Sequence, residues 1–154
     1  MPPARNLKRA LLFAAVCLGV KAVFALLPET VVLPLFCRVP AEAASFYYGV
    51  PLNADALSFT AKGVTLAVTR ACAATDFFAL VSATLVLVHP LHLITAYAFT
   101  LVVNTLRIIA LVPVDAVFPK ENMPVVHLLT GVAFFLPAFV FIWSVCQRRF
   151  RYGR

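Results

Sequence analysis

The chain has 154 residues, of which 63% are hydrophobic and 12% are charged, and its mean hydropathy is +0.97. Soluble domains use roughly 45–50% apolar residues. This chain therefore has too few polar side chains to cover a water-facing surface, which excludes a soluble globular domain. A membrane-spanning helix needs about 20 apolar residues, so the length allows about four spans and one substantial loop.

The net charge of +7 arises from basic residues near the two ends of the chain. These are Arg5, Lys8, Arg9, Arg148, Arg149, Arg151 and Arg154. Basic clusters of this kind keep the ends of a membrane protein in the cytoplasm, whereas a nucleic-acid-binding protein gathers them on one face. We therefore expect two cytoplasmic termini, an even number of spans, the lipid bilayer as a partner, and no nucleic acid.

The first apolar stretch predicts a span over residues 7–27, which ends at Pro28. Residues 41–43 resemble a signal-peptidase site, but they lie well past the end of that stretch, so we expect the helix to be retained. Lys21 lies inside this span. Its ammonium either extends to the interface or contacts a substrate carboxylate.

Residues 28–72 predict an external loop, because prolines interrupt any long helix and the apolar runs are too short to cross a bilayer. A short interfacial helix is expected over residues 40–48. Toward the end of the loop, apolar residues alternate with small or polar ones over residues 64–69, after the turn sequence Lys62-Gly63. This alternation predicts a small β-hairpin.

Three further spans are predicted over residues 73–88, 93–112 and 124–146, with a second external loop over residues 113–123. Pro137 is expected to kink the last of them. The predicted fold is a single-domain, all-α membrane protein over residues 1–154. It is a bundle of four transmembrane helices with an external loop that holds a short helix and a hairpin.

The four cysteines, Cys17, Cys37, Cys72 and Cys146, show no paired C-x-x-C spacing. The sequence therefore predicts neither a zinc site nor a disulfide framework, and we expect no metal and no cofactor. Most free cysteines in an apolar protein behave as small hydrophobic residues. That is our interpretation of every cysteine except Cys72, which lies where a polar segment runs into an apolar helix.

The predicted topology brings Cys72, Arg107 and His127 to the outer side of the membrane. A cysteine reacts in acyl transfer as the thiolate, and with an ordinary pKa of about 8.5 it needs a nearby cation or a helix N-terminus. The start of a helix and the cations Arg70, Arg107 and His127 are the candidates. His127 fits a general acid or base, and Arg107 fits the oxyanion of a tetrahedral intermediate.

Two supporting residues are predicted beside these three. Asn104 precedes Arg107 by one helical turn and could brace it. Asp76 follows Cys72 by one turn and is expected to pair with Arg70 or Arg107, with a role as catalytic base as the alternative. Arg107 is a functional candidate because a guanidinium within a span faces the interior of a bundle, and a purely structural buried pair is the alternative.

The order of these residues resembles the exosortase/archaeosortase family of membrane transpeptidases. It consists of a cysteine after a strand-like segment (Cys72), an Asn-x-x-Arg-Ile sequence late in a helix (Asn104, Arg107, Ile108), and a histidine that opens the next helix (His127). The resemblance covers roughly residues 56–141 and matches the compact, short members. It implies that Cys72 is the nucleophile and that Arg107 and His127 complete the site.

The resemblance also implies a substrate and a location. The expected substrates are secreted proteins whose C-terminal sorting signal has a Pro-Glu-Pro-like motif, a spanning helix and a basic tail. The expected enzyme is a multi-pass protein of the cytoplasmic (inner) membrane. It cleaves the tail on the extracytoplasmic face through a thioacyl intermediate, with transfer to water or to another acceptor. This sequence departs from the family at Ala74, where a glycine is usual.

A second class of function fits the same residues. In it the chain is a non-catalytic membrane scaffold or substrate-binding subunit, and Arg107 and Asn104 hold a structural polar network. A small transporter is disfavoured, because the polar residues gather at one end of the spans rather than near the bilayer midplane.

Overall fold

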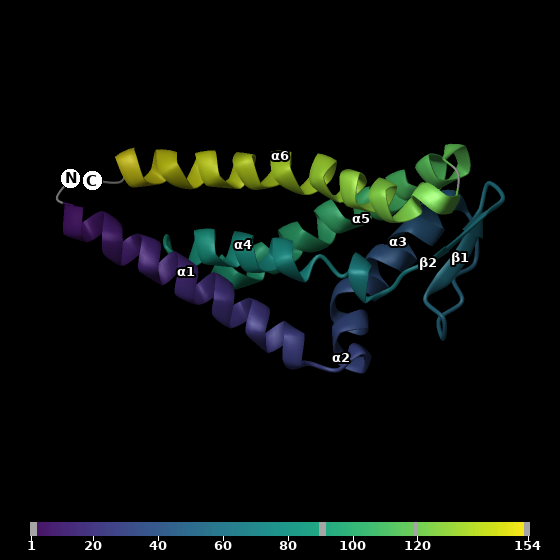
Figure 1. The fold of residues 1–154 in the computed structure, drawn as a ribbon, viewed down its shortest axis with the longest axis horizontal. Coiled ribbons are helices and arrows are strands. Elements are labelled where there is room, and N and C mark those ends of the chain that lie inside the picture. Colours follow the sequence, from purple (N-terminus) through teal and green to yellow (C-terminus); the bar gives the residue numbers. More distant parts are fainter. Residues whose placement is uncertain (1–2, 90–91, 119, 153–154) are drawn as a thin grey trace. The chain divides into compact units, whose positions relative to one another are not determined.

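The protein is described by a computed structural model, which covers residues 3–89, 92–118 and 120–152 (Figure 1). The chain forms two compact units. Unit 1 comprises Met1–Leu27, Thr75–Thr100 and Pro137–Arg154, and unit 2 comprises Pro28–Ala74 and Leu101–Leu136. Every site residue predicted from the sequence, apart from Asp76, belongs to unit 2.

Three helices are long and apolar enough to cross a membrane, within the residues that the structure describes. They are α1 (Pro3–Leu26), α5 (Leu93–Val117) and α6 (Met123–Tyr152). Their candidate spans are 20, 25 and 26 residues long. No residue of the α1 span is buried by the rest of the chain, although the span is apolar throughout. The mostly helical fold is confirmed, and these helices indicate a multi-pass membrane protein.

The fourth predicted span, over residues 73–88, is too short. The helix in this place, α4 (Thr75–Val86), has 12 residues, or about 18 Å at 1.5 Å per residue, against a hydrocarbon core of about 30 Å. Helical geometry begins only at Thr75, because a 3₁₀ turn, η2 (Arg70–Cys72), and the left-handed Ala74 precede it. The expected bundle of four spans is therefore corrected to three candidate spans and one short apolar helix.

In unit 1, α4 packs against α1. The rings of Phe24 and Phe78 meet edge to face across this pair, with centroids 5.8 Å apart, and Lys21 forms an ion pair with Asp76 at 3.2 Å. Both charged side chains are mostly exposed. The ammonium of Lys21 therefore has a protein carboxylate as its partner, which neither alternative from the sequence foresaw.

α5 runs five residues beyond its predicted end, because Pro113 lies inside the helix and does not end it. A proline has no N–H to donate to the carbonyl four residues earlier, which here belongs to Ile109. The hydroxyl of Tyr48 donates to that carbonyl at 2.7 Å and replaces the missing bond. The predicted second loop over residues 113–123 is therefore shorter, and a 3₁₀ turn, η4 (Lys120–Asn122), leads directly into α6.

The first predicted loop is largely helical. α2 (Glu29–Leu33), the π-helical turn η1 (Pro34–Arg38) and α3 (Val39–Tyr48) follow one another without a break. The prediction that Pro34 and Pro40 would interrupt any long helix is wrong, because the wider π turn accommodates the change in hydrogen bonding around the prolines. The end of the predicted helix at Tyr48 is confirmed, and Gly49 caps it with a φ of +64°.

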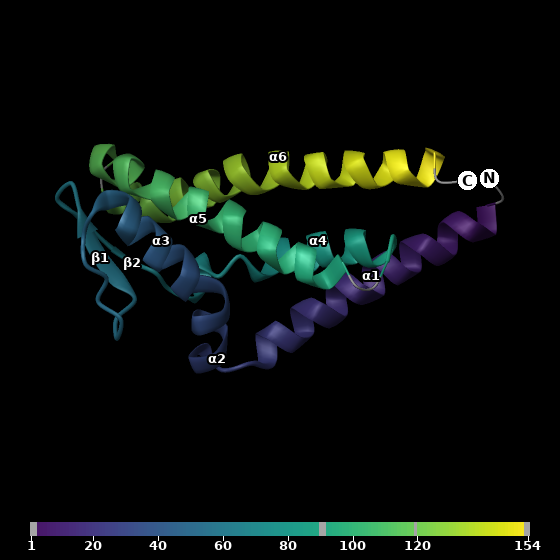
Figure 2. The same cartoon turned by 180° about the vertical axis from the view of Figure 1, so that it is seen from behind.

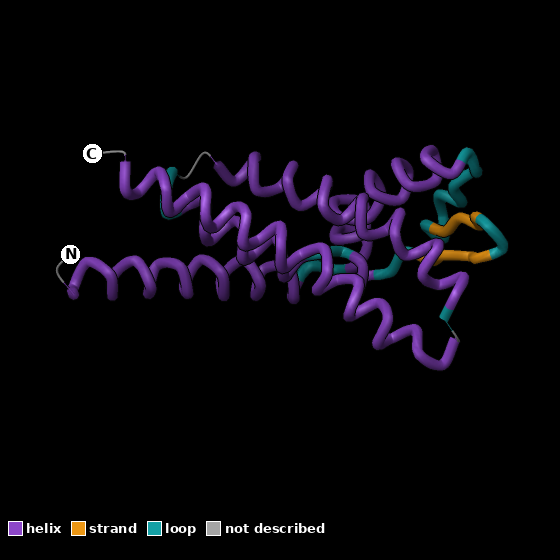
Figure 3. The backbone as a smooth tube through the Cα atoms, turned by 90° about the horizontal axis from the view of Figure 1, so that it is seen from above, coloured by secondary structure: helices purple, strands orange, loops and turns teal. Residues whose placement is uncertain are grey.

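The predicted hairpin is confirmed. β1 (Ser58–Ala61) and β2 (Val64–Ala67) are antiparallel, with Phe59 opposite Leu66 and Thr60 opposite Thr65 (Figure 3). Lys62 and Gly63 both have positive φ, at +52° and +79°, as a two-residue hairpin turn requires. In unit 2, α3 lies beside the hairpin, as Figures 1 and 2 both show.

Candidate functional site

Cys72 is the last residue of η2 and is buried in unit 2. Its main chain is held on both sides. The amide N–H donates to the carbonyl of Thr69 at 2.8 Å, and the carbonyl oxygen accepts a hydrogen bond from Nδ2 of Asn104, also at 2.8 Å. The position of the thiol is therefore fixed by the backbone on which it sits.

Cys37 is a neighbour of Cys72 that the sequence did not point to. Its thiol donates to the same carbonyl of Thr69, at 3.7 Å. Burial, and to a smaller extent the nearby Cys72, raise the pKa of the Cys37 thiol from 9.0 to about 12, while Arg107 acts in the opposite direction. The two thiols and the guanidinium therefore form one electrostatically coupled group. Residues 35 positions apart in an apolar chain give no spacing signal, so only the fold could reveal it.

This raised pKa predicts that Cys37 resists alkylation. At pH 8 a thiol with a pKa of about 12 is ionised to roughly one part in ten thousand, and the thiolate is the reactive form. In the folded protein in mild detergent, we expect iodoacetamide to leave Cys37 unmodified after the time that fully labels it in denaturant. Peptide mass spectrometry measures the modification. Equal rates in the folded and denatured protein would contradict the predicted protection.

Asn104, on α5, joins two segments of unit 2. It is fully buried, and Nδ2 donates to the carbonyl of Phe36 at 3.2 Å as well as to that of Cys72. The carbonyl of Phe36 lacks the α-helical donor four residues later, because that residue is Pro40. Asn104 was expected to brace Arg107, and the bonds that the structure gives it instead hold the main chain around both thiols.

Arg107, one turn further along α5, is 5% exposed. Nη2 donates to the main-chain carbonyl of His127 at 3.4 Å, and the guanidinium carbon lies 5.4 Å from the ring centre of Phe135. A Cβ added to Gly131 would lie 3.6 Å from Nε, so this glycine leaves room beside the guanidinium. Nε is buried and has no hydrogen-bond partner among the described residues. One strong donor is therefore unused.

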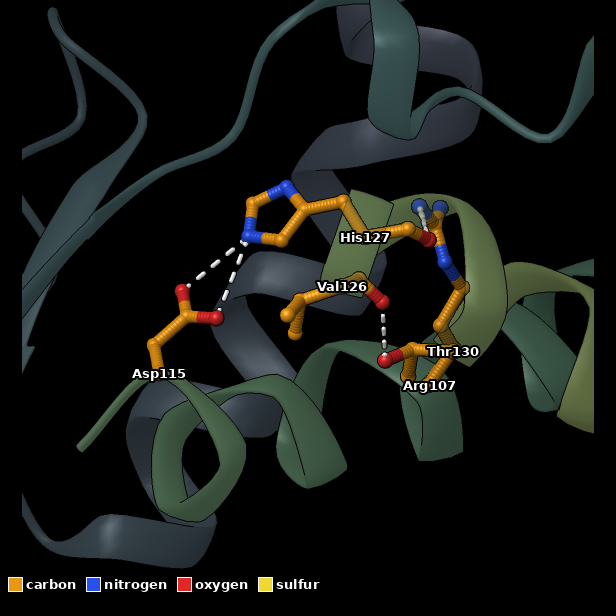
Figure 4. A network of polar contacts seen from close by, with 5 residues as sticks. All are labelled: Arg107, Asp115, Val126, His127 and Thr130. Atoms are coloured by element: carbon orange, nitrogen blue, oxygen red, sulfur yellow. Dashed lines mark hydrogen bonds and ion pairs between the residues drawn. The ribbon is translucent and has the colours of Figure 1, made fainter. Parts of the chain in front are cut away.

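His127, on the second turn of α6, points its ring at Asp115 (Figure 4). Nε2 lies 3.2 Å from Oδ1 and 3.1 Å from Oδ2 of that carboxylate. Figure 4 shows the guanidinium of Arg107 on the other side, at the carbonyl of His127, so Arg107 contacts the backbone of this residue and not its imidazole. The hydroxyl of Thr130 is satisfied by the carbonyl of Val126 in the same helix.

Asp115 is a second residue of the site that the sequence did not single out. It was assigned to a loop because Pro113 was expected to end the helix, whereas α5 continues to Val117 and carries the carboxylate toward α6. The sequence did contain a signal for Asp115. It is a carboxylate in a stretch with few charges, and it lies close in sequence to the candidate histidine. Of the other predicted residues, Arg70 opens η2 two residues before Cys72.

Asp76 does not join this group. It was expected to pair with Arg70 or Arg107, and the structure gives it an ion pair with Lys21 in unit 1.

No three histidine, cysteine, aspartate or glutamate side chains meet as a possible metal site anywhere in the described residues.

Ala74 has a left-handed backbone, with a φ of +52°. An L-residue other than glycine pays about 1–2 kcal/mol in this region, while a glycine adds about 0.4–1 kcal/mol of entropy to the unfolded chain. We expect Ala74→Gly to raise the free energy of unfolding by about 0.5–1 kcal/mol in detergent titrations. The matched control is Ala73→Gly. Ala73 has a φ of −73°, so this variant should be destabilised, and stabilisation of both variants would contradict the explanation from strain.

Comparison of the chain with protein-family models, with curated proteins and with solved structures finds no match. The reactions that unit 2 can carry out therefore follow from its own residues. They comprise a thiol on a fixed backbone, a buried guanidinium with an unused donor, and an imidazole oriented by a carboxylate.

Proposed function

We propose that the protein is a membrane cysteine peptidase or transpeptidase. It cleaves the C-terminal sorting signal of secreted proteins, which consists of a Pro-Glu-Pro-like motif, a spanning helix and a basic tail. The observation that carries the proposal is a set of contacts in unit 2. Asn104 donates to the carbonyl of Cys72, and Arg107 interacts electrostatically with the Cys72 thiol and donates to the main-chain carbonyl of His127. The three long apolar helices support it, since such substrates present their tails from within a bilayer.

The proposed reaction has two steps. The thiolate of Cys72 attacks the carbonyl carbon of the scissile peptide bond, and the electron pair of the C=O bond moves to oxygen. This oxyanion needs a hydrogen-bond donor, and the unused Nε–H of Arg107 is our candidate for that donor. His127 then gives a proton to the departing amine. A thioester to Cys72 remains, and water or an acceptor amine attacks it, releasing the thiol and the new acyl product.

The backbone at Ala74 gives further support. The resemblance leads us to expect a glycine at this position, and its φ of +52° is one that favours glycine. The chain therefore retains the local conformation in which a glycine is useful, at the expense of strain in the alanine.

The test follows loss of the tail from a substrate. The chain is expressed with a secreted reporter that ends in a Pro-Glu-Pro motif, a spanning helix and a basic tail, and an immunoblot follows removal of the tail. We expect Cys72→Ala to reduce processing to background, because no other group supplies the thioester. Cys17→Ala, in α1, is the matched control and should process like the parent. Processing by Cys72→Ala at the parent rate would contradict the proposal.

A non-catalytic scaffold is the second candidate. The observation that favours it is that Asn104 and Arg107 both donate to main-chain carbonyls, as residues that only hold a fold together do. It predicts that Arg107→Ala lowers the yield of folded protein while Cys72→Ser leaves reporter binding and processing unchanged. The peptidase proposal predicts the opposite for Cys72→Ser.

A further inference from the structure

The contact between Asp115 and His127 is more specific than an ion pair at a helix end. The Asp115 side chain is 8% exposed and the His127 side chain 32% exposed. A single ring nitrogen, Nε2, faces both carboxylate oxygens at nearly equal distances of 3.1 and 3.2 Å. A carboxylate accepts hydrogen bonds and cannot donate them. Nε2 must therefore carry a hydrogen in this arrangement.

The other ring nitrogen, Nδ1, makes no contact with the carboxylate and can take part in proton transfer. A neutral imidazole has one N–H and one lone pair, and the hydrogen bond made by one nitrogen decides which tautomer is present. With the hydrogen held on Nε2, the lone pair is on Nδ1. Figure 4 shows Nδ1 on the side of the ring that points away from the carboxylate of Asp115.

We propose that Asp115 is a positioning residue that fixes His127 in the Nε2–H tautomer, so that Nδ1 is the nitrogen that moves protons in the reaction. This inference rests on the peptidase proposal. It differs from the usual arrangement of a catalytic triad, in which the carboxylate holds Nδ1–H and Nε2 reacts. Asp115 touches neither thiol nor substrate, and it acts only through the ring of His127.

Every proton that moves in this reaction can be traced. Nδ1 accepts the proton of the Cys72 thiol, which gives a thiolate and an imidazolium with hydrogens on both nitrogens. Asp115 remains ionised and stabilises that positive charge. Nδ1 then returns its proton to the departing amine nitrogen. The ring ends as the neutral Nε2–H tautomer from which it began.

The fold explains why a carboxylate is available at this point. Asp115 follows Pro113 by two residues, and it reaches α6 only because α5 continues through the proline. The hydroxyl of Tyr48, by replacing the bond that Pro113 removes from Ile109, keeps that last part of α5 helical. The orientation of His127 therefore depends on a residue of α3 as well as on Asp115.

Two variants and one control test this inference in the full-length protein in detergent. Asp115→Asn replaces the carboxylate with a carboxamide, whose oxygen can accept from the Nε2–H tautomer and whose N–H can donate to the Nε2 lone pair of the Nδ1–H tautomer. Asp115→Glu keeps the charge. Glu121→Gln, in the exposed part of η4, removes a carboxylate nearby in sequence and is the control. The first readout is the ¹⁵N spectrum of protein labelled at histidine, with the His127 signals assigned from His127→Gln.

We expect the parent, Asp115→Glu and Glu121→Gln to show a protonated Nε2 and a lone pair on Nδ1. Asp115→Asn should show a mixture of tautomers or the Nδ1–H form. In the processing assay, Asp115→Asn should lower kcat by roughly 10²–10⁴-fold, the usual contribution of general acid–base catalysis, with KM nearly unchanged, and Asp115→Glu should recover most of it. A His127 spectrum that is the same with and without the carboxylate would overturn the inference.

The spectrum also separates this inference from the proposed function. Full processing by Cys72→Ala would remove the peptidase proposal, whatever the tautomer of His127. A parent spectrum with the hydrogen on Nδ1 would remove the positioning role of Asp115, even if Cys72 proves to be the nucleophile. An unchanged kcat in Asp115→Asn would remove that role as well.

Discussion

Asn104→Leu is expected to lower the free energy of unfolding by roughly 2–6 kcal/mol, because two carbonyls lose their donor and each buried unsatisfied group costs about 1–3 kcal/mol. These carbonyls belong to Phe36 and Cys72. Leucine has the same branched shape and the same number of side-chain heavy atoms as asparagine, so the substitution leaves no cavity. The measurement is the midpoint of denaturant or SDS unfolding in mild detergent. The same variant should also reduce processing, because the backbone of Cys72 is no longer held.

The position of Pro40 allows this explanation to be tested in a double-mutant cycle. Pro40→Ala gives the chain back an N–H four residues after Phe36. In the Asn104→Leu background, it should therefore recover part of the lost stability. It cannot help the carbonyl of Cys72, so recovery should be incomplete. If Pro40→Ala has the same effect in both backgrounds, the hydrogen bond to Phe36 is not what Asn104 contributes.

The second large effect is expected from a single hydroxyl. Tyr48→Phe leaves the carbonyl of Ile109 without a donor beside Pro113, and we expect a loss of about 1–3 kcal/mol. The ring itself should stay in place, since it stacks on Phe59 with centroids 6.4 Å apart. Burial and the adjacent Tyr47 raise the pKa of Tyr48, so its hydroxyl keeps the proton that it donates.

The chain offers a matched control and a rescue for this variant. Tyr47→Phe removes a hydroxyl from the neighbouring residue, which is 67% exposed, and its stability should match that of the parent. Pro113→Ala restores the N–H that Ile109 lacks, so Tyr48→Phe should cost much less in that background. Unfolding midpoints of the four proteins in this cycle measure the coupling. A coupling energy near zero would contradict compensation of Pro113 by Tyr48.

Local patterns in the sequence predicted those elements that depend only on neighbouring residues. Hydropathy located α1, α5 and α6, and alternation with the Lys62-Gly63 turn located the hairpin. The span over residues 73–88 was overestimated because an apolar run has the same composition whether it faces lipid or protein. Only the fold distinguishes them, since most of α4 is buried against other helices.

The errors at the site come from contacts between residues that are far apart in the sequence. Pro113 was expected to end a helix because the residue that offsets its missing N–H, Tyr48, lies 61 positions away. That error placed Asp115 in a loop and hid the partner of His127. Cys37 was expected to behave as a small hydrophobic residue, but its proximity to Cys72 depends on Thr69 and on the π turn of η1. Cys72, Arg107 and His127 were identified from their chemistry, and their roles stay predictions.

Pro113 and Tyr48 combine a residue that removes a helical hydrogen bond with a distant residue that replaces it. The proline without the tyrosine leaves the carbonyl of Ile109 without this replacement donor, whereas Asn104 also donates to the carbonyl of Cys72 and is useful without Pro40. Pro113 and Tyr48 should therefore be inherited together. Among descendants and ancestors of this chain, loss of the tyrosine should accompany loss of the proline, and a chain that has replaced both should fold as well as one that has kept both.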